Sequence, residues 1–130
     1  MWNGVAVSNK LLAENPGVVE RYYLRAIAKG REFARRYKEP AVAIVAKYNP
    51  LPADALAVDY DSALVSMTEE GSVSDDVLRD EVAARADLIK APRLTDLSKA
   101  FDYSIIRRVY GELKTTWKTK PLSADYARER

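Results

Sequence analysis

The feature that most constrains the fold is a run of apolar residues spaced three and four apart, which is the spacing of one helix face. Its members are Val19, Tyr23, Ala26, Ile27, Gly30, Phe33, Ala34 and Tyr37. Asn15 and Pro16 precede this run. An Asn cap followed by Pro at the first helical position is a strong start signal. We therefore predict a long helix that begins at Asn15–Pro16 and ends near residue 37.

Charged residues occupy most of the other side of this helix. They are Arg21, Arg25, Lys29, Glu32, Arg35 and Arg36. They could form a basic surface for a polyanion, or simply the solvated side of an amphipathic helix. The whole chain carries 21 basic and 19 acidic side chains, a net charge of +2, so no field of one sign covers it. This balance favours the solvated face and counts against a nucleic-acid partner.

Prolines and capping residues divide the following residues into further helices. Residues 41–48 are apolar almost all round, which predicts a short helix buried on several sides. Pro52 opens a third helix, with Asp54 in its first turn. We expect its buried face to consist of Leu56, Tyr60, Ala63, Leu64 and Met67.

Two more helices complete the predicted set. Ser74 caps a fourth helix, whose inward residues are Leu78, Val82, Ala86 and Ile89. A last helix starts at Asp102, and its buried stripe consists of Ile106, Val109, Tyr110 and Leu113. The helical signal fades after Leu113, so we predict a single helical domain over residues 1–113 and an irregular tail over 114–130.

One short strand is predicted at the start of the chain, in residues 4–8 (GVAVS), which are rich in Val and flanked by turn residues. The predicted fold class is therefore mainly α: a layer of about five helices with one short N-terminal strand. A strand needs a partner for its backbone N–H and C=O groups. It must pair with a second copy of the chain or with a sheet that these residues do not supply.

Candidates for chemistry are few. The chain has no Cys, which excludes disulfides and thiol nucleophiles, and no His, which removes the commonest metal ligand and neutral-pH proton carrier. Asp59 and Asp61 lie two apart on a predicted helix and so face different directions. We expect no catalytic residue, no metal site, no cofactor and no enzymatic activity. No apolar run approaches the ~18 residues that span a membrane, so we also expect no transmembrane segment.

The order of four segments resembles the C-terminal part of periplasmic solute-binding proteins of ABC importers, of the nitrate/sulfonate/taurine and thiamine-precursor class. These segments are residues 4–36 (GVAVSNKLLAENPGVVERYYLRAIAKGREFARR), 39–50 (EPAVAIVAKYNP), 64–82 (LVSMTEEGSVSDDVLRDEV) and 97–113 (LSKAFDYSIIRRVYGEL). The resemblance implies a helical layer over the sheet of the first of two α/β lobes. The chain departs from that pattern because it lacks the N-terminal sheet and the second lobe.

The resemblance also implies a function. The protein would capture a small solute such as nitrate, a sulfonate, taurine or a thiamine precursor in the periplasm and deliver it to an ABC permease. Most ligand contacts would lie in the portion that this chain lacks, and Trp2 and Asn3 would line the cleft. We expect no signal peptide within these residues, because residues 1–10 (MWNGVAVSNK) show no basic segment followed by a long apolar run.

An alternative from another class is a stand-alone helical module for protein interaction or oligomerisation. Its exposed strand and apolar faces would be buried against another protein or a second copy. We expect a homo-oligomer held by residues 4–8 and by the apolar side of the 41–48 helix. Nucleic-acid binding through Arg21, Arg25, Lys29, Arg35 and Arg36 is a third and less favoured hypothesis.

Overall fold

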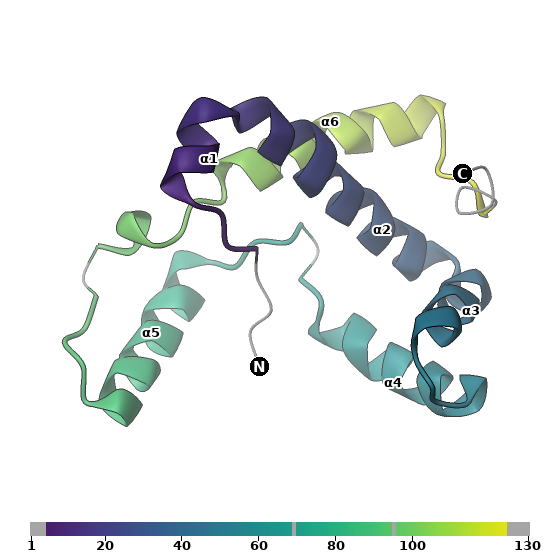
Figure 1. Ribbon diagram of the computed structural model, residues 1–130, viewed down its shortest axis with the longest axis horizontal. Coiled ribbons are helices and arrows are strands. Elements are labelled where there is room, and N and C mark those ends of the chain that lie inside the picture. The colour runs from purple at the N-terminus through teal and green to yellow at the C-terminus, as the bar shows by residue number, and fades with distance from the viewer. Residues whose placement is uncertain (1–4, 69, 95, 125–130) are drawn as a thin grey trace.

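The chain is mainly α-helical, as its periodicity predicts. A computed structural model describes residues 5–68, 70–94 and 96–124. The helical segments within these ranges are α1 (Asn9–Glu14), the π-helical η1 (Val18–Leu24), α2 (Arg25–Arg36), α3 (Lys38–Tyr48), α4 (Ala53–Ser66), α5 (Asp75–Ile89), the 3₁₀ turn η2 (Leu97–Lys99) and α6 (Ser104–Thr119). Figure 1 shows α2 and α6 along one side of the molecule, with α3–α4 and α5 as two arms on the other.

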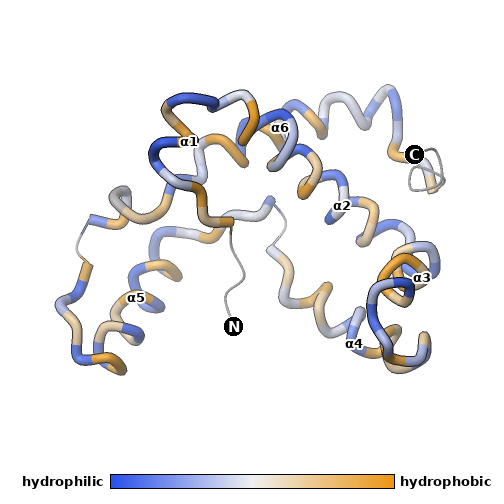
Figure 2. Tube along the Cα trace, viewed as in Figure 1, coloured by the Kyte–Doolittle hydropathy of each residue, from blue (hydrophilic) through white to orange (hydrophobic). Residues whose placement is uncertain are grey.

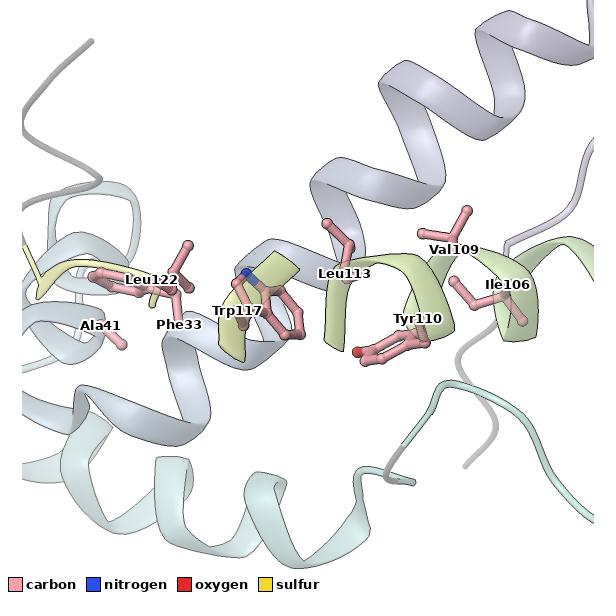
Figure 3. Close-up of a cluster of buried hydrophobic side chains, with 9 residues drawn as sticks. Phe33, Ala41, Ile106, Val109, Tyr110, Leu113, Trp117 and Leu122 are labelled. Atoms are coloured by element: carbon pink, nitrogen blue, oxygen red, sulfur yellow. The ribbon is translucent and has the colours of Figure 1, made fainter. Parts of the chain in front are cut away.

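The core lies where α6 packs against α2 and the start of α3 (Figure 3). Its buried residues are Ala28, Phe33, Ala41, Ile106, Val109, Tyr110, Leu113, Trp117 and Leu122. The four residues predicted as the stripe of the last helix are all among them, so that prediction is confirmed. The rings of Tyr110 and Trp117 meet edge to face, with centroids 6.5 Å apart, which is a favoured aromatic geometry.

The predicted irregular tail over 114–130 is wrong in its first part, because α6 continues to Thr119. Trp117 follows Leu113 by four residues and therefore extends the buried stripe by one more turn. Beyond the helix, Leu122 is also buried, and its carbonyl oxygen accepts a 2.5 Å hydrogen bond from the Tyr37 hydroxyl. Trp117, which looks isolated in the sequence, thus continues the buried apolar stripe of α6.

The predicted strand is wrong for residues 5–8, which form neither a strand nor a helix; Gly4 lies outside the described residues. The Ser8 hydroxyl instead accepts a 3.1 Å hydrogen bond from the Leu11 N–H and caps α1. No strand occurs anywhere in the ranges that the structure describes, so this backbone has no sheet edge to join. A helix cap is then the alternative that satisfies its polar groups.

A short helix, α1, precedes the predicted long helix and ends at Asn15. This residue ends α1 by donating its backbone N–H to the Leu11 carbonyl oxygen at 2.9 Å, and helical residues resume at Pro16. The Asn15 carbonyl oxygen accepts the Val18 N–H at 3.0 Å. No side-chain cap bond forms at the start of η1, so the predicted cap by the Asn15 side chain is wrong, while the restart at Pro16 agrees with the prediction.

The π-helical turn in η1 changes which residues of α2 face the core. A π-helix has more residues per turn than an α-helix, so residues after it are rotated relative to a regular 3.6-residue pattern. Tyr23 and Ala26, both predicted to be inward, are exposed. Leu24 packs against the core and Ala28 is fully buried, although neither was predicted.

The α3 helix begins earlier than predicted, at Lys38, and is buried on one side only. Ala41 and Val42 are buried, whereas Val45 is exposed and Tyr48 is 86% exposed. The prediction of burial on several sides is therefore wrong within this chain. The other side of α3 is apolar but uncovered.

Helices α4 and α5 begin where predicted but do not bury all of their predicted inner residues. α4 follows Pro52 and buries Leu56, while Ala63 is exposed. In α5 the Ser74 cap is confirmed, since its hydroxyl accepts the Val77 N–H at 3.4 Å. Leu78 and Ala86 are buried, whereas the predicted Ile89 is 70% exposed.

The burial of Trp117 gives a direct test of the extended α6. We expect Trp117→Ala to lower the free energy of unfolding by about 3–5 kcal/mol, because truncating a buried aromatic removes contacts and leaves a cavity. The control is Tyr22→Ala: Tyr22 is 75% exposed, and the change should cost under about 0.5 kcal/mol. Urea titrations followed by far-ultraviolet circular dichroism measure both. Equal losses would mean that residues 114–119 do not pack on the core.

Candidate protein-interaction surface

The predicted ligand-lining residues, Trp2 and Asn3, lie outside the described residues. Their role therefore stays a prediction. Across residues 5–68, 70–94 and 96–124, no group of three or more acidic side chains is placed to hold a metal ion. None of the helices in the same ranges is long and apolar enough to cross a bilayer.

A groove of about 300 Å³ between α2 and α6 collects basic side chains. It is lined by Glu32, Arg35, Arg36, Tyr110, Lys114, Trp117 and Lys118. Three of its cations have structural partners. Arg36 pairs with Glu32 at 2.5 Å, Lys114 pairs with Glu70 at 2.6 Å, and Arg35 bonds backbone carbonyls. Lys114 and Arg35 thus join α6 and α2 to the segment that follows α4, whereas the Arg36 pair lies within α2. The groove therefore has a structural explanation.

The basic residues that the sequence offered to a polyanion do not act as one surface. Arg25 forms an ion pair with Glu112 of α6, and Arg36 pairs within its own helix. Arg35, predicted to be on the solvated side, is half-buried and donates to the carbonyl oxygens of Met67 and Thr68 at 3.1 and 3.0 Å. The prediction for Arg35 is wrong because the end of α4 packs over that side of α2.

Two Arg side chains attach the end of α4 to α2. Besides Arg35, the guanidinium of Arg31 donates to the Thr68 carbonyl oxygen. The last carbonyls of a helix have no partner within it and carry its negative dipole end. A guanidinium that donates to carbonyls at that end gives them a hydrogen-bond partner and places a positive charge at the negative end of the helix dipole. The position of α4 thus depends on two charged side chains as well as on packing.

The inner face of α4 rests against α3. Tyr60 packs near the core, and burial raises the pKa of its phenol, with the Asp61 and Glu39 carboxylates adding to the effect. Its hydroxyl is buried without a hydrogen-bond partner among the described residues. Lys38 at the start of α3 pairs with Asp61 at 2.6 Å. These contacts hold α4 against α3, and the opposite side of α4 is exposed at Val58 and Val65.

The outer face of α4 is apolar and uncovered. Val58 is 70% exposed and Val65 is 90% exposed, and Leu51 just before the helix is about half exposed. The sequence signal for this face was present, because α4 has apolar residues on all sides and a helix of that kind is normally buried all round. The predicted buried stripe covers only the inner face of α4.

A second apolar surface lies along α5. A groove of about 600 Å³ runs between the last turns of α5 and the segment that leads to η2. It is lined by Glu81, Val82, Arg85, Ala86, Ile89, Ala91, Pro92, Leu94 and Phe101. Its two charged residues, Glu81 and Arg85, neutralise one another at 2.9 Å. An apolar groove of this kind suits an apolar side chain of a partner better than a polar solute.

The chain exposes more surface than a compact monomer of its size. Its accessible area is 9721 Å², whereas a folded monomer of 14.6 kDa exposes about 6900 Å². The excess includes many large apolar side chains: Val5, Leu11, Val18, Tyr22, Tyr23, Val45, Tyr48, Leu51, Val58, Val65, Val77, Leu88, Ile89 and Leu94. They lie on both arms and on the N-terminal segment. Figure 2 shows hydrophobic residues along these same segments.

Comparison with known proteins identifies no relative. No family model matches the chain, and neither a curated protein nor a solved structure matches it. The resemblance to solute-binding proteins therefore stays a prediction. What the described geometry can do chemically is bury apolar helix faces against another protein surface.

The Arg contacts to α4 can be tested by substitution. We expect Arg35→Ala to lower the free energy of unfolding by about 1.5–3 kcal/mol, because hydrogen bonds from a charged donor are lost and carbonyls at the end of α4 lose their partner. Amide hydrogen exchange in α4 should also accelerate. Arg36→Ala, which breaks an exposed pair within one helix, should cost under about 0.5 kcal/mol. Exchange in α4 that is unchanged by Arg35→Ala would contradict this attachment.

Proposed function

We propose that the chain is the C-terminal helical part of a solute-binding protein of an ABC importer. It contributes to the capture of a small solute, such as nitrate, a sulfonate, taurine or a thiamine precursor, and carries out no catalysis. The identity rests on the order of the four resembling segments. The class of action, binding without chemistry, is supported by a sequence without His or Cys.

One observation carries the proposal: the area of 9721 Å² is about 40% above the value expected for a compact chain of this mass. Helix α3 is apolar on both sides but covered on one, since Val45 and Tyr48 are exposed. A helical layer that covers a sheet needs such second faces. In this proposal the sheet and the second lobe come from the remainder of a two-lobe protein, and Trp2 and Asn3 lie at the edge of its ligand cleft.

The proposal also assigns a place and a partner. A solute-binding protein of this class works in the periplasm and delivers its ligand to an ABC permease. The helices described here would form the outer layer of one lobe. Their part in binding would be to hold the sheet rigid rather than to contact the solute.

The test combines gene neighbourhood with reconstitution. We expect the gene to lie beside genes for a permease and an ATPase, and beside or within sequence that encodes the two-lobe remainder. That remainder should bind the chain when co-expressed, and the complex should bind one of the four solute types by isothermal titration calorimetry. The chain alone should release no heat with any of them. A neighbourhood without importer genes, together with no bound solute, would overturn the proposal.

A second candidate, a stand-alone helical interaction or oligomerisation module, is favoured by a different observation. The uncovered apolar residues of the described chain lie mostly on helices, and residues 5–8 offer no strand. Apolar helix faces suit helix–helix contacts directly. In this reading the homo-oligomer is held by the outer side of α3, at Val45 and Tyr48.

Sedimentation velocity at micromolar concentration tests that candidate. We expect a dimer or larger species, because exposed apolar patches of several hundred Å² usually bind a partner. Tyr48→Glu should shift the protein toward monomer, since it places a charge in the contact. Val77→Glu, at an exposed apolar site on α5, is the control and should not. A monomeric wild-type protein would count against this candidate.

A further inference from the structure

We propose that the outer face of α4 binds an amphipathic helix of another protein, and that Lys or Arg flanks the apolar stripe of this helix. The face consists of Leu51, Ala55, Val58, Ser62 and Val65, all exposed. These positions are separated by four, three, four and three residues. That alternation is the a/d spacing by which one helix packs along another. The inference rests on the proposed function in one respect, that uncovered apolar faces of this chain bind protein.

The charges beside this face specify the partner. With Ala55 and Ser62 at a positions, Asp54 and Asp61 fall at the g positions just before them. Asp59 falls at the e position just after Val58. Side chains at e and g flank the apolar contact and form the interhelical ion pairs that select a partner. All three acidic residues of α4 therefore line the two edges of one apolar stripe.

No cation of α4 balances these carboxylates, because residues 53–66 contain no Lys or Arg. Within the described residues, Asp61 has one ion pair, with Lys38, and Asp54 and Asp59 have none. An exposed ion pair such as Lys38–Asp61 contributes little. The edges of the stripe are thus open to basic side chains of an incoming helix.

A second copy of α4 is a poor occupant of this face. Either orientation would set Asp against Asp along both edges, which is unfavourable for paired helices. α5 of a second copy is no better, since Asp75, Asp76, Asp80, Glu81 and Asp87 outnumber Arg79 and Arg85. α6 is basic, but its apolar stripe is already buried in its own core. Charge complementarity therefore selects a basic helix other than α4, α5 and α6 of a second copy.

The face is preformed. Arg31 and Arg35 hold the end of α4, and Leu56 packs its inner side. The one polar side chain in the stripe, Ser62, directs its hydroxyl to the Val58 carbonyl oxygen of its own helix at 3.5 Å. It can therefore be covered without leaving its hydroxyl unpaired. A partner helix would meet a fixed surface and lose mainly its own conformational freedom.

The experiment compares two labelled peptides by fluorescence anisotropy with the whole chain. Both have about two and a half heptads with Leu at a and d. One carries Lys at e and g, and the other carries Glu. We expect the Lys peptide to bind at least about tenfold more tightly, which corresponds to about 1.4 kcal/mol. Raising NaCl from about 0.1 to 1 M should narrow the difference, because the Debye length falls from about 10 to 3 Å.

Three variants locate the binding. Val58→Glu should abolish binding of the Lys peptide, and Val77→Glu on α5 is the matched control that should leave it unchanged. The double variant Asp54→Lys/Asp59→Lys should reverse the preference in favour of the Glu peptide. Circular dichroism verifies that each variant keeps its helical content. Reversal by charge exchange cannot arise from a loss of folding.

Two results would overturn the inference. The first is equal binding of both peptides, or a preference that the double variant does not reverse. The second is a homodimer of the wild-type chain that Val58→Glu dissociates, because a second copy would then occupy the face. Peptide binding and gene neighbourhood are independent measurements. If the importer assignment fails but the double variant reverses the peptide preference, this inference stands. If the importer assignment holds and the preference is not reversed, only the proposed function stands.

Discussion

The packing of α6 against α2 is the contact on which the rest of the structure depends. It joins residues of the first third of the chain, such as Ala28 and Phe33, to Val109, Leu113 and Trp117 near its end. Helices of 12 and 16 residues, the lengths of α2 and α6, are only marginally stable alone in water. Their stability therefore comes from the apolar faces that they bury against each other. The α3–α4 arm is attached to this pair, because the start of α3 shares its core and Arg31 and Arg35 of α2 reach the residues that follow α4.

The arms depend on fewer contacts. α4 is held through α3 and by two guanidinium groups that reach the Met67 and Thr68 carbonyls just after its last residue. α5 contacts η2 in the segment that follows it. Neither arm is covered on its outer side, which explains how a chain with an ordinary apolar content exposes so large an area. An open arrangement of this kind is suited to binding another surface, because apolar faces that one chain leaves exposed can be buried by a second.

Local rules succeeded where one or two residues decide the outcome. Ser74 caps α5 as expected. The start of α6 was predicted two residues early: the helix begins at Ser104 rather than at Asp102. The Asp102 carboxylate accepts the Ser104 N–H at 2.8 Å, and hydrogen bonds from Ser104 hold the pKa of this carboxyl below the usual range. The same rules failed at Asn15, where a good capping residue ends one helix rather than starting the next. They failed again at residues 5–8, because strand formation requires a neighbour that local sequence cannot supply.

The candidate surface was only partly predictable for a related reason. The apolar residues on both sides of α3 and α4 are visible in the sequence, and so are the acidic residues beside the outer stripe. The sequence does not show which side of each helix is covered. That depends on the packing of α3 against α4 and on the hydrogen bonds from Arg35 to the Met67 and Thr68 carbonyls. The half-buried position of Arg35 has no local signal, since its partners are backbone carbonyls about thirty residues away.

The sequence by itself determined that the chain is helical, where most helices begin, and which face of α6 is buried. These properties follow from the 3.6-residue period and from capping, which act over one or two turns. Only the tertiary structure decided the π-helical turn that rotates α2, the extension of α6 through Trp117, and the uncovered outer faces of the arms. Those depend on contacts between residues far apart in the chain, and helical periodicity carries no information about which faces meet.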